Sequence, residues 1–453
     1  MQFVRSWFRP SPTTLVSPFL DSMLVGGISI VAFVVIHIAV SRGADIYAWS
    51  VALYYAAFLI NFPHFMASYL LMYGDARGSF ELRGENKRQT IKMWWAGVVV
   101  PILLIGYFLM ARAEGSITLM GYLVNALFFF VGWHYIKQIF GCVVVLSAMK
   151  RVYYNRLERI ALLLPLYLLW ALSYFNSNLS EAENVFYGVP YTSLGLSPQL
   201  LALSEQTLFV ASCLLLAMFI IKYLISRVTP PVSAMVALAS LYLWYLPAIS
   251  HPFYFYIIPL FHSLQYLLFV FAARRNQALH EDRVTPDARE GIATRYNFLG
   301  SGLLILLPAL LIGAFYQIPG GMTFDRHIVL WQEHITSLGI VGVVLALVTV
   351  GLIAYLYRRG RGLAGLVTFF GLAYLLGFLA FVLVPLLLDL LVTRGLAPDW
   401  LSYPAVFGTS LYFFFFTLFL NIHHYFIDNV IWKKENPYVR DYLMYRPQEN
   451  QTL

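Results

Sequence analysis

The chain has 453 residues, of which 60% are hydrophobic and only 11% are charged, and its mean hydropathy is +0.72. Soluble domains are about 45–50% apolar and about 25% charged, so this composition excludes an ordinary soluble protein. The net charge of +8 does not indicate nucleic-acid binding, because nearly all basic residues fall in segments on one side of the predicted membrane helices.

Apolar stretches long enough to cross a bilayer as a helix recur along the whole chain. We therefore predict an all-α, polytopic transmembrane bundle of about twelve spans, forming a single integral membrane domain over residues 1–453. The predicted spans are 17–41, 46–73, 93–111, 117–147, 160–175, 206–226, 232–250, 252–273, 297–318, 337–357, 363–391 and 404–431.

Lys and Arg set the predicted orientation, because cytoplasmic loops carry an excess of both residues. With twelve spans, 25 of the 30 Lys and Arg residues fall on the side of the N-terminus. We therefore predict a multi-pass protein of the cell inner (plasma) membrane with both termini in the cytoplasm. Residues 176–205 are then the largest external loop, and residues 432–453 form a cytoplasmic tail.

Histidines occur inside four of the apolar segments, at His64, His134, His262 and the pair His423–His424. An ionisable side chain in hydrocarbon costs a few kcal/mol or more, so such residues usually mark a functional site. All four segments are even-numbered spans, which cross the membrane in the same direction and place the histidines at similar depth. The pattern predicts one shared intramembrane site, although a single buried histidine is more often a packing residue.

Each of these histidines has a polar residue one helical turn away, where side chains at i,i+3 and i,i+4 meet. The amides are Asn61, Gln138, Gln265 and Asn421. A metal-ligating imidazole usually donates its second N–H to such a partner, so we expect these four amides to support a bound cofactor.

Two further residues are candidates for catalysis. Lys137 is the most costly buried charge, and Asp428 follows His424 by four residues. The side chains of His423 and His424 project about 100° apart on a helix, so they cannot share one orientation. Because Asn421 and Asp428 flank His424 at helical spacing, His424 is favoured over His423 as a ligand.

Imidazole suits iron, copper or zinc. With only Cys142 and Cys213 in the chain and few buried carboxylates, a non-haem iron held by His64, His134, His262 and His423 or His424 is the first choice. Aromatic residues make up 17% of the chain and crowd the histidines, which indicates a hydrophobic, lipid-soluble substrate. The sequence therefore predicts a membrane-bound iron oxygenase or related oxidoreductase, surrounded by membrane lipids.

Three alternatives remain at this stage. The buried His, Lys and Asp residues could relay protons in a multispan transporter. Paired histidines could instead bind haem and serve electron transfer. The chain could also be a noncatalytic membrane partner.

The segment Phe261-His262-Ser263-Leu264-Gln265-Tyr266, with the other membrane-buried histidines, resembles the bacterial Brp/Blh-type carotene dioxygenases. These integral membrane proteins hold a non-haem iron through histidines and cleave β-carotene to retinal, so the resemblance implies an iron-dependent dioxygenase. Tyr266 stands where that family has a second histidine, and this chain is longer, with more predicted spans.

Overall fold

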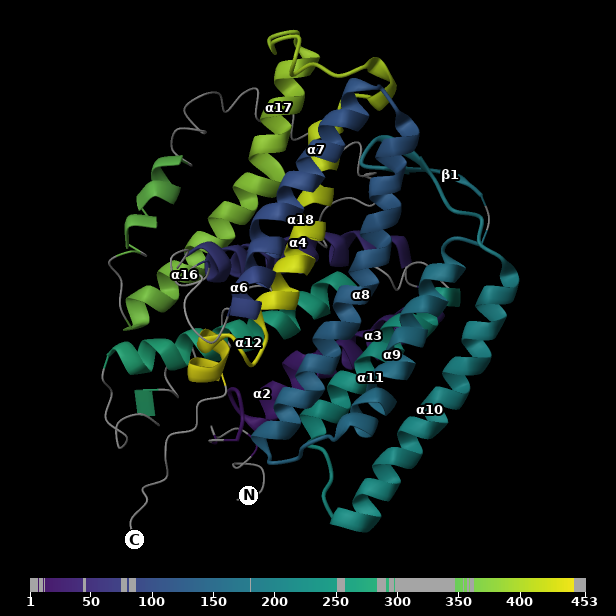
Figure 1. The fold of residues 1–453 in the computed structure, drawn as a ribbon, viewed down its shortest axis with the longest axis vertical. Coiled ribbons are helices and arrows are strands. Elements are labelled where there is room, and N and C mark those ends of the chain that lie inside the picture. The colour runs from purple at the N-terminus through teal and green to yellow at the C-terminus, as the bar shows by residue number, and fades with distance from the viewer. Residues whose placement is uncertain are drawn as a thin grey trace.

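The computed structural model of the chain consists almost entirely of helices (Figure 1). It describes residues 13–43, 46–74, 87–179, 181–250, 257–282 and 362–443, with residues 7, 11, 80, 291, 292, 297, 347–352, 354–356 and 358. The helices of the first half are α2 Pro18–Ser22, α3 Ile28–Ser41, α4 Ile46–Tyr73, α6 Lys87–Trp94, α7 Val100–Ala113, α8 Ile117–Met149, α9 Arg156–Asn176 and α10 Pro198–Ser226. Those of the second half are α11 Val232–Ser250, α12 Ile257–Glu281, α16 Gly362–Phe378, α17 Val384–Thr393 and α18 Leu411–Ile431.

Six helical segments in the described part of the chain are long and apolar enough to cross a membrane. They are Pro18–Ser41, Lys87–Ala113, Ile117–Met149, Arg156–Asn176, Pro198–Ser226 and Ala364–Thr393. Helix α18 is not among them, because its polar residues, including His423, His424 and Asp428, lower its hydropathy. The helical membrane character is thus confirmed, whereas the number of twelve spans stays a prediction.

Several predicted segments differ from the helices. The expected span 404–431 begins as a helix only at Leu411, after the 3₁₀ turn η7 at Ala405–Phe407. Helix α9 is longer than the predicted 160–175, because Asn155 and Glu158 form a capping box that starts it at Arg156. Two predicted spans lie outside the described residues for most of their length. They are 297–318, of which only residue 297 is described, and 337–357, apart from the apolar helix Leu347–Leu356.

The segment predicted as an external loop, 176–205, contains regular secondary structure. It contains an antiparallel hairpin of β1 Glu183–Phe186 and β2 Val189–Thr192, and its residues 198–205 belong to α10. Tyr187 and Gly188, in the turn, both have positive φ, as a two-residue hairpin turn of the primed type requires. Asn125 of α8 donates a hydrogen bond to the Thr192 carbonyl (3.1 Å), which ties the hairpin to the helix below it.

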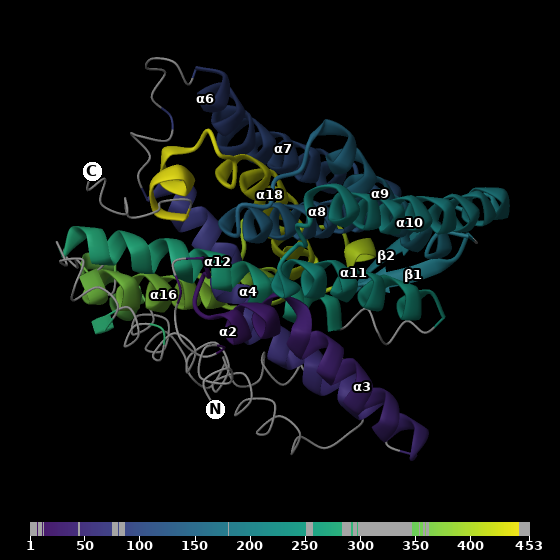
Figure 2. The same cartoon turned by 90° about the horizontal axis from the view of Figure 1, so that it is seen from below.

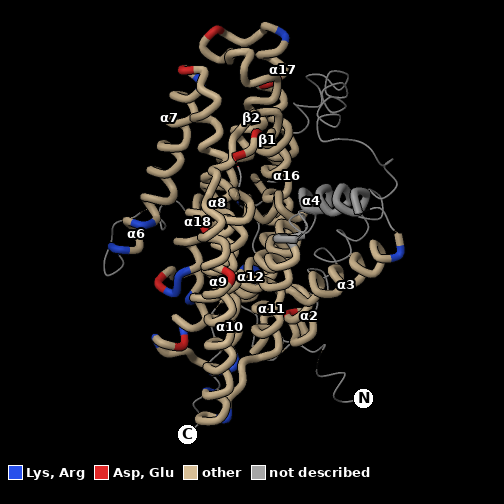
Figure 3. Tube along the Cα trace, turned by 90° about the vertical axis from the view of Figure 1, so that its right-hand side faces the viewer, with Lys and Arg blue, Asp and Glu red and all other residues tan. Residues whose placement is uncertain are grey.

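Charge is distributed unevenly over the molecule (Figure 3). The Lys and Arg residues at the ends of α9 and α10 lie toward the end opposite the β1–β2 hairpin. This arrangement agrees with a charge asymmetry between the two sides of a membrane.

Four helices meet at the centre of the fold. Helix α18 packs on both α4 and α8, and α12 packs on α4. Figure 2 shows these helices in the middle of the molecule, with α3 and α10 at its periphery. In Figure 1, α12 crosses the lower half while α8 and α18 run more nearly along the long axis, so the four helices cross rather than lie parallel.

Four π-helical turns in the described part of the chain pack on these central helices. They are η1 Met23–Gly27, η3 Trp95–Val99, η6 Leu379–Leu383 and η8 Val439–Leu443. A π turn interrupts the regular i to i+4 ladder and often accompanies a functional site. Here the Val25 carbonyl of η1 accepts from Gln265, and the Ala96 carbonyl of η3 bonds with His423 (3.0 Å).

The start of α18 is fixed by a buried carboxyl group. Asp389 of α17 is 2% exposed and accepts hydrogen bonds from the backbone N–H groups of Tyr412 (2.9 Å) and Phe413 (3.0 Å). These donors belong to the first turn of α18, which has no helical partner for them. Asp389 therefore sets the position of the helix that carries His424 and Asp428.

We expect Asp389→Ala to destabilise the protein by about 1–2 kcal/mol, because two buried N–H groups lose their acceptor. Thermal unfolding of the detergent-purified protein would measure the loss. Asp399→Ala is the matched control, because Asp399 is exposed and its side chain does not cap α18. Equal melting temperatures for both variants would contradict this role of Asp389.

Candidate metal centre

Four imidazoles, one from each central helix, pack against one another. His64 lies on α4, His134 on α8, His262 on α12 and His424 on α18, and each is at most 4% exposed. The ring centroids of His64 and His424 are 4.5 Å apart, and those of His134 and His262 are 4.7 Å apart. The crossed pairs, His64–His262 and His134–His424, are each separated by 5.0 Å. The histidines of the four predicted spans therefore share one site.

Asp428 supplies a carboxyl group to the same cluster. Its Oδ1 accepts hydrogen bonds from Ser68 Oγ (2.6 Å) and from the Tyr266 hydroxyl (3.0 Å). Its Oδ2 lies 3.2 Å from His424 Nε2 and 3.8 Å from His134 Nε2. One oxygen is thus held by α4 and α12, while the other is directed at the imidazoles.

The hydrogen bonds around His64 favour one tautomer. Ser263 Oγ donates to Asn61 Oδ1 (2.5 Å) and lies 2.7 Å from His64 Nδ1. Because the serine hydroxyl has a single proton, this orientation of Asn61 makes Ser263 the acceptor of His64 Nδ1–H. The Nε2 of His64 then carries a lone pair, and it is buried without a hydrogen-bond partner. A metal-ligating histidine has this arrangement, with one nitrogen held by an outer partner and the other available.

The remaining amides predicted to support a cofactor brace the helices. Gln138 donates from Nε2 to the His262 carbonyl (2.9 Å) and to Gln265 Oε1 (2.8 Å), which joins α8 to α12. Asn421 donates to the Thr417 carbonyl (2.7 Å) and accepts from the Tyr425 hydroxyl (2.9 Å). These contacts orient the backbone and the cavity wall, and only Asn61 reaches an imidazole, through Ser263.

Two of the predicted site residues lie elsewhere. The ring of His423 bonds with the Tyr69 hydroxyl at Nδ1 (2.9 Å) and with the Ala96 carbonyl at Nε2 (3.0 Å). The ammonium group of Lys137 lies 5.4 Å from the centre of the Tyr167 ring on α9. Neither side chain joins the group around Asp428.

The donor atoms form a group that could hold a metal ion. One nitrogen each from His64, His134 and His424 and one oxygen from Asp428 all lie within 4.8 Å of one another. His134 Nε2 and His262 Nε2 are 3.0 Å apart, and two nitrogens bonded to one metal at 2.0–2.1 Å lie about 2.9–3.4 Å apart. Both ring nitrogens of His424 and Oδ2 of Asp428 are buried without hydrogen-bond partners, as is His64 Nε2. Such unpartnered groups are costly to bury, and a bound cation would satisfy them.

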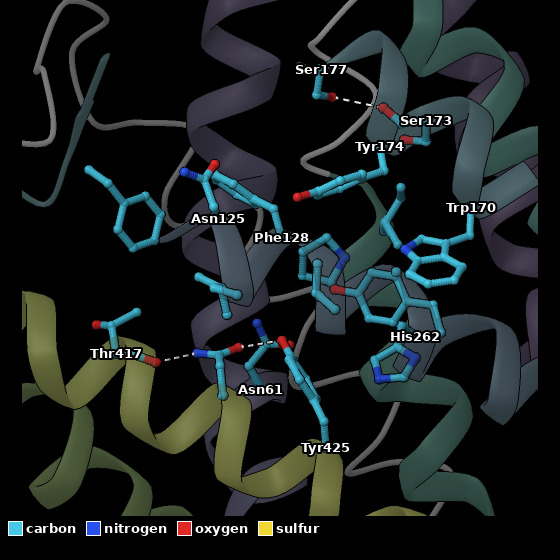
Figure 4. Close-up of a pocket in the computed structure, with 18 of the residues that line it drawn as sticks. Asn61, Asn125, Phe128, Trp170, Ser173, Tyr174, Ser177, His262, Thr417 and Tyr425 are labelled. Carbon is cyan, nitrogen blue, oxygen red and sulfur yellow. Dashed lines mark hydrogen bonds between the residues drawn. The ribbon is translucent and has the colours of Figure 1, made fainter. Parts of the chain in front are cut away.

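A cavity of about 730 Å³ adjoins the cluster (Figure 4). His64 and His262 form part of its wall at one end, and side chains of the β1–β2 hairpin line the other end. Aromatic residues are the largest group among those that line the cavity, and they include Phe65, Phe128, Tyr135, Trp170 and Tyr425. Its volume falls within the range of about 300–1,000 Å³ that is usual for small-molecule sites.

Aromatic rings also cover the imidazoles directly. Tyr425 stacks on His134 with centroids 4.6 Å apart, Tyr135 lies 4.3 Å from His262, and Phe65 lies 4.5 Å from His424. These contacts restrict the orientation of each ring and exclude water from the cluster.

Sequence reasoning overlooked three hydroxyl groups at this site, those of Ser68, Ser263 and Tyr266. Ser68 follows His64 by four residues and Tyr266 follows His262 by four, so the spacing used for the amides would have found both. Ser263 is adjacent to a histidine in the sequence and contacts a different one, so no periodicity could have found it.

A comparison with protein-family models, with curated proteins and with solved structures found no match for the chain. The resemblance of residues 261–266 to the carotene dioxygenases therefore stays a prediction. In the structure, the Tyr266 hydroxyl of this segment donates a hydrogen bond to Asp428 Oδ1 (3.0 Å).

Proposed function

We propose that the protein is a membrane-embedded metalloenzyme in which His64, His134, His424 and Asp428, together with His262, hold a non-haem transition metal beside a hydrophobic substrate cavity. The observation that carries the proposal is the group of four buried residues whose donor atoms lie within 4.8 Å of one another, and in three of them, His64, His424 and Asp428, such an atom has no hydrogen-bond partner. Iron is our choice of metal, because this group contains the two-histidine, one-carboxylate ligand set of non-haem iron oxygenases.

The residues have distinct roles in this proposal. The metal is bound by Asp428 Oδ2 and by the four histidines His64, His134, His262 and His424. Ser263, Ser68 and Tyr266 hold His64 and Asp428 in a fixed orientation. The aromatic walls place an apolar substrate next to His64 and His262 and keep water out. Iron in such a site supplies oxygen-dependent oxidation when bound, so the reaction class is an oxygenation or related oxidation.

A bare ion is a better fit than haem. A porphyrin would have to lie between its axial ligands or over one of them. The imidazoles here are packed at 4.5–5.0 Å between centroids, which leaves no room for a macrocycle among them.

The alternative of a proton-coupled transporter has less support. A transporter of this kind would relay protons through Lys137, the buried histidines and Asp428. In the structure, however, the Lys137 ammonium group lies 5.4 Å from the centre of the Tyr167 ring on α9, away from Asp428. We retain the proposal of about twelve spans in the inner membrane with both termini cytoplasmic, supported by the distribution of Lys and Arg.

Metal analysis and an optical spectrum of the detergent-purified, full-length protein test the proposal. We expect close to one iron per chain and no Soret band. Removal of the metal with a chelator should be reversible, and the loaded protein should consume oxygen when given its substrate.

The result that would overturn the proposal is a protein with no transition metal that also binds none when Fe²⁺ is added without oxygen. A Soret band would support haem binding instead. Stoichiometric zinc in place of iron would keep the site but would contradict the oxygenase reaction.

A further inference from the structure

The two ends of the cavity differ in chemistry. His262 lies at one end, and Asn125, Tyr174 and Ser177 lie at the hairpin end (Figure 4). His64, which also lines the cavity, packs against His262 with ring centroids 5.0 Å apart. Asn125 and His134 lie nine residues apart on α8, a separation of about 13 Å at 1.5 Å per residue. A ligand that spans the cavity therefore places its two ends in different surroundings.

The hairpin end has open hydrogen-bonding groups. Asn125 uses Nδ2 for its bond to the Thr192 carbonyl, and its Oδ1 accepts no hydrogen bond from any residue that the structure describes. The Tyr174 hydroxyl likewise has no hydrogen-bond partner in the described part of the chain. Asn125 and Tyr174 both line the hairpin end of the cavity (Figure 4), so an acceptor and a phenol hydroxyl are available there to a ligand hydroxyl, which can donate to the first and accept from the second.

The hairpin end of the cavity has no charge to offer a ligand. None of the residues that line the cavity, all of which the structure describes, is Lys, Arg, Asp or Glu, so a bound metal would supply charge only at the end formed by His64 and His262. A phosphate or carboxylate at the hairpin end would lose its hydration without gaining a counter-charge, which costs several kcal/mol. The hairpin end therefore favours an uncharged polar group.

We propose that the cavity binds an uncharged, elongated lipophile that ends in a hydroxyl group. The hydroxyl lies between Asn125 and Tyr174, and the apolar body extends along the aromatic walls to His64 and His262. This inference names the substrate class of the metal site and rests on the proposed function for its role in a reaction, although the binding itself needs no metal.

The width of the cavity depends on Gly132. Trp170 of α9 lies over this glycine and donates from Nε1 to the Phe129 carbonyl (3.1 Å). A Cβ at position 132 would lie only 2.7 Å from Trp170 Nε1, so the indole would have to move, and it already forms part of the cavity wall. At Gly141, on the same helix, a Cβ would meet nothing within 4 Å.

Three ligands with one carbon skeleton test the proposal: farnesol, farnesyl phosphate and farnesene. Their affinities for the full-length protein would be measured in detergent by competition with radiolabelled farnesol. We expect saturable binding of farnesol, binding of farnesene that is about threefold to tenfold weaker, and binding of farnesyl phosphate that is weaker still.

Two variants locate the ligand. Asn125→Leu should reduce farnesol affinity to that of farnesene without changing farnesene affinity. Gly132→Ala should weaken both ligands by about tenfold, whereas the control Gly141→Ala should change neither. Because the comparison of ligands on the wild-type protein needs no variant, a folding defect in either one leaves the test intact.

The proposal is overturned if farnesol does not bind saturably, if farnesyl phosphate binds as well as farnesol, or if Asn125→Leu weakens farnesol and farnesene equally. The same measurements on His424→Gln separate this proposal from the metal site. Unchanged farnesol binding in a protein without metal would support the cavity even if the metalloenzyme proposal failed.

Discussion

His424→Gln should remove the bound metal, whereas His423→Gln should leave it in place. The two histidines are adjacent on α18 and both are buried, at 0% and 2% exposure. His424 lies 3.2 Å from Asp428 Oδ2 in the donor group, whereas His423 bonds with Tyr69 and the Ala96 carbonyl. Replacing an outer partner of a metal usually costs about 10- to 100-fold in affinity, and loss of a ligand should cost more.

The measurement is the metal affinity of each variant, determined by competition with a chelator in detergent. Glutamine suits both positions because it is polar and of similar size, while its amide is a poor ligand for iron. Melting temperatures of the chelator-treated proteins show whether either substitution disturbs the fold. Equal loss of metal in both variants, with similar stability, would mean that α18 does not orient His424 alone toward the site.

Asp428→Asn should weaken metal binding without destabilising the metal-free protein. Metal affinity should fall at least 100-fold, because a carboxylate ligand becomes a neutral amide. The metal-free protein should be at least as stable as the wild type, because a neutral amide avoids the cost of burying an incompletely paired carboxylate. The new amide could also donate to His424 Nε2, which lies 3.2 Å from Oδ2 and has no hydrogen-bond partner.

Thermal unfolding after chelation and metal titration of the same preparation would give the two effects. A carboxyl group with a purely structural role would predict the reverse, a clear loss of stability with unchanged metal affinity. Asp428→Ala is the companion variant, because it also removes the acceptor of Ser68 and Tyr266 and should destabilise the fold.

Local sequence was sufficient to predict most of the described helices. The predicted segments 46–73 and 232–250 coincide with α4 and α11, and 117–147 differs from α8 by two residues. The bilayer is the physical reason, since it requires about 20 apolar residues per helix and leaves a clear signal in composition. Helix ends set by capping, such as Arg156 of α9, were less well predicted, because a cap depends on one or two side chains.

The sequence also predicted the helices that carry the candidate site, because apolar segments that keep histidines are unusual. The sequence could predict contacts only between side chains of the same helix, because residues three or four positions apart lie on one face of it. His424 and Asp428, four residues apart on α18, are an example. Contacts between helices, such as Ser263 with His64 and Ser68 with Asp428, join residues about 200 and 360 positions apart, and no sequence periodicity encodes them.

The sequence by itself thus determined a helical membrane protein with histidines in four helices, because hydrophobic length and buried ionisable groups are local properties. Only the tertiary structure decided which side chains face the site. The packing of α18 against α4 and α8 directs His424 inward and His423 toward η3, and the packing of α8 against α9 places Lys137 on Tyr167. The neighbouring helices determine how a helix is rotated about its own axis. A helix that is apolar on nearly all sides has no distinct polar face, so its sequence did not predict this rotation.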